Sequence, residues 1–120
     1  MGTGPTAMQW YAKAMGDLER VRTAESRLAS SMGGGGAAVT AAADELQAAT
    51  RDAIAWLADN PNPDRSLADK VARFIKAYAA LQRAAQETAA YPDLEPGEAR
   101  TRLRDLISVV DYQSQKLHAW

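Results

Sequence analysis

The chain has 120 residues, a formal net charge of −1 and no cysteine. This length suits one domain with a sizeable core and is too short for two independent cores, so we expect a single domain over residues 1–120. The absence of cysteine excludes disulfides, thiolate nucleophiles and cysteine zinc sites, and the balanced charge gives no bulk electrostatic reason to bind nucleic acid or anionic lipid.

The first predicted helix covers about residues 6–32. Thr6, followed three residues later by Gln9, matches the capping box that starts many helices. Apolar positions then recur at alternating steps of three and four, which is the spacing of one helical face. This predicted stripe consists of Tyr11, Ala14, Leu18, Val21, Glu25, Leu28 and Met32.

Glu25 is the one charged residue on this stripe. Burying an unpaired charge is costly, so we expect a buried polar residue with a basic partner. In an antiparallel bundle Glu25 lies level with the start of the fourth helix, which makes Arg100 or Arg104 the expected partner. An acid held in an apolar pocket for a functional purpose is the alternative.

Four glycines at positions 33–36 end the first helix, because glycine loses the most backbone entropy in a helix and readily adopts positive φ. A glycine run can also cradle a phosphate, but that motif needs a lysine and a serine or threonine after a strand, and residues 37–39 supply neither. A second helix is predicted over about residues 37–59. Its many alanines favour helix and should let a neighbouring helix approach closely.

The third predicted helix, about residues 63–90, is the centre of the fold. The two prolines of the preceding Asn60-Pro61-Asn62-Pro63 stretch force a break, and Pro63 suits the first helical position behind Asn62 as the cap. One face of the helix is apolar and the opposite face is charged. The apolar face consists of Leu67, Val71, Phe74, Tyr78, Leu81, Ala85 and Thr88.

A fourth helix is predicted over about residues 96–119, after a second proline-marked break. The four helices have similar lengths and short connections, which favours neighbouring antiparallel helices. We therefore expect an all-α, antiparallel up-down-up-down four-helix bundle. Two long hairpins that pair across a dimer are the alternative architecture.

No residue pattern indicates an enzyme, a cofactor or a metal site. A di-metal site in a bundle needs inward glutamates and Glu-x-x-His pairs, whereas His118 is the only histidine and lies close to the end of the chain. No segment approaches the roughly 20 apolar residues of a membrane span, and the start of the chain lacks the basic and apolar regions of a secretory signal. We expect a cytoplasmic protein, and its alanine content, with more arginine than lysine, favours a bacterial or phage origin.

Antiparallel topology predicts that aromatic residues gather at one end of the bundle, where they either close the core or bind a partner. Closing the end of the core is the favoured alternative. If some of them instead remain exposed as anchors, the predicted ones are Trp10 and Trp120, because each lies near a chain end and Trp10 lies off the apolar stripe. The predicted partner-binding residues are Trp10, Tyr11, Trp56, Tyr112 and Trp120.

The expected function is therefore that of a non-catalytic helical bundle that binds another protein or itself. Nucleic-acid association through basic stripes on the third and fourth helices is an alternative, although acidic residues lie within a turn and no aromatic residue interleaves for stacking. A ligand pocket at the aromatic end is a further alternative. The candidate basic surface consists of Arg73, Lys76, Arg83, Arg100 and Arg104.

Overall fold

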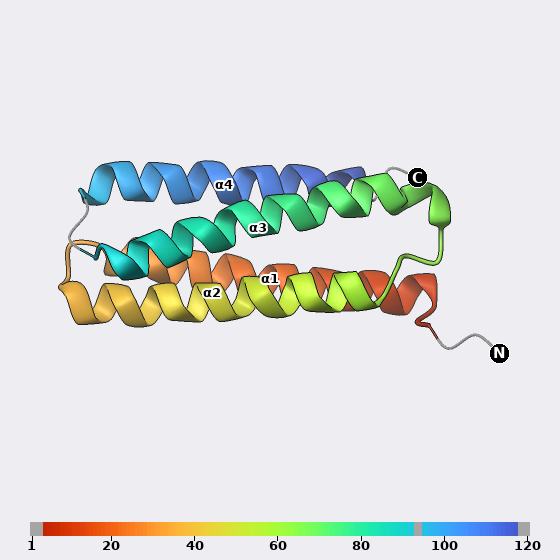
Figure 1. Ribbon diagram of the computed structural model, residues 1–120, viewed down its shortest axis with the longest axis horizontal. Helices are drawn as coiled ribbons and strands as arrows, with labels where there is room; N and C mark the ends of the chain where they lie inside the picture. Colours follow the sequence, from red (N-terminus) through yellow and green to blue (C-terminus); the bar gives the residue numbers. More distant parts are fainter. Residues whose placement is uncertain (1–3, 93–94, 118–120) are drawn as a thin grey trace.

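The protein is an all-α, up-down-up-down four-helix bundle, as predicted (Figure 1). The computed structural model describes residues 4–92 and 95–117. Each helix packs against the helix before it, and α4 returns beside α1, so that a closed bundle forms within one chain. The helices run along the longest of its dimensions, 51 × 23 × 17 Å. Its elements are α1 (Ala7–Ser31), α2 (Gly36–Asp59), the 3₁₀ turn η1 (Arg65–Leu67), α3 (Ala68–Ala90) and α4 (Pro96–Lys116).

Helix α1 begins and ends with the local signals that the sequence predicts, a capping box at its start and a glycine turn after it. At the start of α1 the Thr6 hydroxyl accepts from the Gln9 N–H at 3.2 Å, and the Gln9 side chain accepts from the Thr6 N–H at 2.9 Å, which completes the capping box. Gly33 and Gly35 have φ of 89° and 115°, which other residues rarely adopt. Glycine is therefore required at these two positions of the turn.

The start of α3 differs from the prediction. Asn62 does not cap a helix at residue 63: it is buried, and its Oδ1 accepts from the Asp64 N–H at 2.8 Å. Asp64 in turn caps η1 by accepting from the Ser66 N–H at 3.0 Å. Such local side-chain bonds compete with helix formation, and α3 consequently begins at Ala68. At the other end of the chain, the predicted fourth helix extends past residue 117, outside the described residues.

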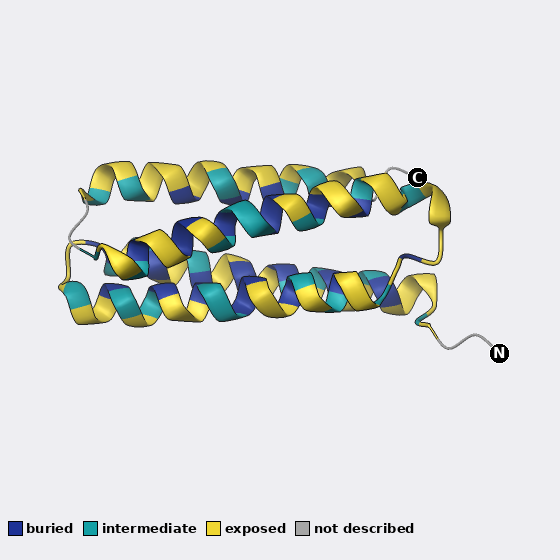
Figure 2. Ribbon diagram, in the orientation of Figure 1, coloured by how far each residue is buried: buried dark blue, intermediate teal, exposed yellow. Residues whose placement is uncertain are grey.

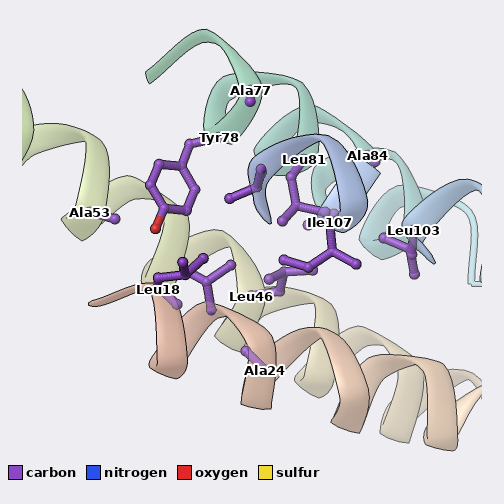
Figure 3. Packing of buried hydrophobic residues seen from close by; sticks show 14 of the residues in the cluster. Leu18, Ala24, Leu46, Ala53, Ala77, Tyr78, Leu81, Ala84, Leu103 and Ile107 are labelled. Carbon is purple, nitrogen blue, oxygen red and sulfur yellow. The ribbon is translucent and has the colours of Figure 1, made fainter. Parts of the chain in front are cut away.

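The apolar face of α3 is buried as predicted, apart from Leu67, which is half-buried in η1 (Figure 2). After Trp10 of α1, it supplies the two largest fully buried side chains of the core. The rings of Phe74 and Tyr78 lie 4.7 Å apart and have no exposed surface. Figure 3 shows Tyr78 reaching from α3 into the space between the helices. Its hydroxyl is buried and has no hydrogen-bond partner among the described residues. Helix α3 packs most closely against the alanine-rich α2, whereas α1 and α4 form the loosest interface.

The buried stripe of α1 differs from the predicted one. It consists of Trp10, Ala14, Leu18, Val21, Ala24 and Leu28. Tyr11 and Glu25, which were expected on the stripe, are half-buried at its edge beside α4. The indole of Trp10 buries more apolar area than a phenol ring, and Ala24 permits closer helix contact than a glutamate. Trp10 and Ala24 are therefore buried in the core in place of the adjacent Tyr11 and Glu25.

Candidate functional site

The end of the bundle where α1 begins contains three of the predicted partner-binding aromatic residues. The ring of Trp10 lies 5.1 Å from Tyr11 in an edge-to-face arrangement and 6.0 Å from Trp56. The Trp10 N–H donates to the carbonyl oxygen of Asn60 at 2.7 Å. This link joins the start of α1 to the end of α2, so the aromatic end is part of the structural core.

The predicted partner-binding residues differ in their exposure. Trp10 has no exposed surface and its only polar atom is hydrogen-bonded, so it closes the end of the core, and the alternative in which Trp10 is an exposed anchor is wrong. Tyr11 and Trp56 are half-buried. Tyr112 is exposed on the outer surface of α4, and Trp120 lies outside the described residues. Of the four described aromatic candidates, Tyr112 is thus the most exposed.

Two cavities lie beside the connection between α2 and α3, at the aromatic end. One, of about 470 Å³, is lined by Ala7, Met8, Tyr11, Asn62, Asp64, Leu67 and Leu117. The other, of about 610 Å³, opens between α2 and α3 and shares Asn62. The amide Nδ2 of Asn62 is buried without a hydrogen-bond partner among the described residues. Asn62 therefore lines both cavities, but its Nδ2 is enclosed and has no accessible surface toward them.

The outer surface of α4 carries two large apolar side chains in solvent. Val109 is 47% exposed and Tyr112 is 53% exposed. The Lys116 Nζ lies 4.9 Å from the centre of the Tyr112 ring. Val109 is absent from the sequence prediction, although a signal existed: it lies off the Leu103, Val110 stripe and is nevertheless apolar.

Polar contacts join α1 to α4. Arg22 donates to one Asp111 oxygen through Nε at 2.9 Å and Nη2 at 2.6 Å. Arg100 donates to the carbonyl oxygens of Ala29 and Met32, at 3.0 and 2.7 Å, and so satisfies backbone groups at the end of α1. Arg22, Asp111 and Arg100 are therefore already engaged in contacts that hold α1 and α4 together.

Glu25 belongs to the same interface and is half-buried, not fully buried as predicted. Burial raises the pKa of its carboxyl, the positive charge of Arg104 lowers that pKa, and the negative charge of Asp111 raises it. Arg104, one of the two predicted partners, therefore acts on Glu25 at a distance, while Arg100 binds carbonyl oxygens instead.

The five residues of the predicted basic surface do not share one face. Arg73, Lys76 and Arg83 are exposed on α3. Arg100 and Arg104 lie toward α1, which is diagonally opposite α3 in the bundle. A continuous phosphate-tracking stripe across α3 and α4 is therefore not formed by these residues.

No protein-family model, curated protein or solved structure matches the chain. Within residues 4–92 and 95–117, no three histidine, aspartate or glutamate side chains are grouped as a metal site requires. None of the helices in the same ranges is long and apolar enough to cross a membrane.

Proposed function

We propose that the protein is a non-catalytic helical-bundle module that acts by binding another protein molecule, either a partner or a second copy of itself. The observation that supports this proposal is the exposed pair Val109 and Tyr112 on α4. Tyrosine is among the residues most enriched in binding hot spots, and the bundle can present an outer helix face without disturbing its core.

The first test of this proposal is the mass of the protein in solution. We expect the mean mass in light scattering to rise with protein concentration, and the protein to leave heparin at low salt with no absorbance excess at 260 nm. A constant monomer mass, together with heparin retention that falls steeply with salt, would instead support nucleic-acid association.

A ligand pocket at the aromatic end is the second candidate function, supported by the unpaired Asn62 amide beside the two cavities. A small apolar molecule would bind against the largely apolar lining of these cavities, with the Asn62 side chain as one of its contacts. Screening such molecules for an increase in the melting temperature of the wild type, which Asn62→Ala should not show, tests this function separately from association.

A further inference from the structure

Four exposed side chains on α4 have symmetric spacing and complementary chemistry. Asp105, Val109, Tyr112 and Lys116 are separated by four, three and four residues, and all are exposed. Steps of three and four place them on one side of the helix. From one end the order is acid, apolar, apolar, base, and from the other end it is the reverse.

Neither of the two charges at the ends of this set is neutralised by an acid or base within the described fold, although the Lys116 ammonium lies over the Tyr112 ring. Two other charges of α4 form ion pairs within the fold: Arg102 is paired with Glu87, and Asp111 is paired with Arg22. Asp105 and Lys116 form no ion pair within the part of the chain that the structure describes. They are therefore available to another molecule.

We infer that α4 pairs antiparallel with α4 of a second copy, about a two-fold axis midway between Val109 and Tyr112. Such an axis places each residue opposite its mirror position in the set. Asp105 then faces Lys116 of the second copy, and Val109 faces Tyr112. Each charge lies about 8 Å along the helix from the axis, at 1.5 Å per residue, and both pairs occur twice because the contact is isologous.

The second copy is favoured over an unrelated partner because this surface complements itself. A parallel arrangement would place Asp105 against Asp105 and Lys116 against Lys116, whereas the antiparallel one pairs opposite charges. The paired stretch, residues 105–116, is only about 17 Å long. A contact this short buries less surface than the roughly 800 Å² per partner of a standard interface. The dimer is therefore weak and forms at high protein concentration.

The first test uses Val109→Asp and sedimentation equilibrium up to about 1 mM protein, the range in which weak complexes form. The variant places a carboxylate against the apolar centre of the contact, and the short aspartate side chain does not reach a lysine there. We therefore expect dimerisation to be at least about tenfold weaker. Met8→Asp, a matched change at an exposed apolar position on α1, should dimerise as the wild type does. Circular dichroism confirms that both variants fold.

The second test exchanges the charges. Asp105→Lys and Lys116→Glu should each weaken the dimer by about tenfold, since the two-fold axis makes every change act twice. The double variant should return to within about threefold of the wild type, which a merely structural effect would not produce. Asp44→Lys, with the same charge change on the exposed surface of α2, is the control.

The inference rests on the proposed function, and the outcomes separate the two. If the wild type associates but neither Val109→Asp nor the charge exchange alters it, the α4 contact is wrong and the proposed function stands. If the wild type remains monomeric throughout, the inference is overturned, and heparin retention would then overturn the proposed function also.

Discussion

The indole of Trp10 combines complete burial with a hydrogen bond to the carbonyl oxygen of Asn60. Quenching of its fluorescence tests this placement. In the double variant Trp56→Phe, Trp120→Phe, where Trp10 is the sole tryptophan, we expect weak quenching by iodide because the charged quencher cannot reach the ring. The same variant unfolded in urea provides the reference. Equal quenching in the folded and unfolded states would contradict the burial of Trp10.

The hydroxyl of Tyr78 is a buried donor without a described acceptor. Such a group costs stability, so Tyr78→Phe should raise the free energy of unfolding by about 1 kcal/mol, where truncations in cores normally lower it. Tyr112→Phe, on the exposed surface, should stay within about 0.5 kcal/mol of the wild type. Urea unfolding measures both, and a loss of stability in Tyr78→Phe would show that the hydroxyl has a partner.

The same hydroxyl predicts a pH dependence. Burial raises the pKa of Tyr78, the charges of Asp17 and Asp111 raise it further, and Arg22 opposes them. A folded-state pKa above the unfolded value of about 10 gives stability that is present below that pH and is lost as the pH rises. The wild type should therefore lose stability above about pH 10 more steeply than Tyr78→Phe.

At the scale of the helices, α2 and α3 pack closely because α2 is rich in alanine. Ala53, on α2, is 1% exposed, and a larger side chain there would force the helices apart. We expect Ala53→Leu to lower the free energy of unfolding by about 1–3 kcal/mol. Ala55 lies two residues further along α2 and is exposed. Ala55→Leu should therefore change the free energy of unfolding by less than about 0.5 kcal/mol. If urea unfolding gave the same change in the free energy of unfolding for both variants, the interface between α2 and α3 would not be closely packed at Ala53.

The helices themselves could be predicted from the sequence wherever one interaction dominates. The α3 stripe has large apolar residues at regular spacing, and the Thr6 capping box is a local signal. The start of α3 could not be predicted from prolines alone, because the side chains of Asn62 and Asp64 bind nearby backbone N–H groups in place of a helix. On α1, adjacent Trp10 and Tyr11 both fit an apolar stripe, and only packing against the other helices decides between them.

The candidate site was harder to predict than the fold. Antiparallel topology correctly gathers Trp10, Tyr11 and Trp56 at one end, since helix ends are fixed by chain order. Exposure depends on rotation about the helix axis, which a one-residue change of stripe alters by 100°. For that reason Trp10 is buried, and the exposed candidate surface lies on α4 around Val109 and Tyr112.

For the whole molecule, the loosest interface is the one between α1 and α4. Local opening takes place where few apolar contacts must break, so amides of α4 should exchange hydrogen through smaller openings than those of α3. Arg100→Ala removes two bonds to α1 carbonyl oxygens and should speed exchange in α4 further. Arg83→Ala, on the outer surface of α3, is the control. Uniform exchange through global unfolding in all helices would contradict this order.

The Tyr11 hydroxyl donates to the carbonyl oxygen of Leu117 at 2.7 Å, so the start of α1 lies beside the end of α4. A circular permutant that joins these ends and is cut within the glycine turn would keep every helix beside its present neighbours. Its chain order would be α2, α3, α4, α1. The contact that now closes last in sequence, between α1 and α4, would become a local hairpin, and the contact between α1 and α2 would become the long-range one.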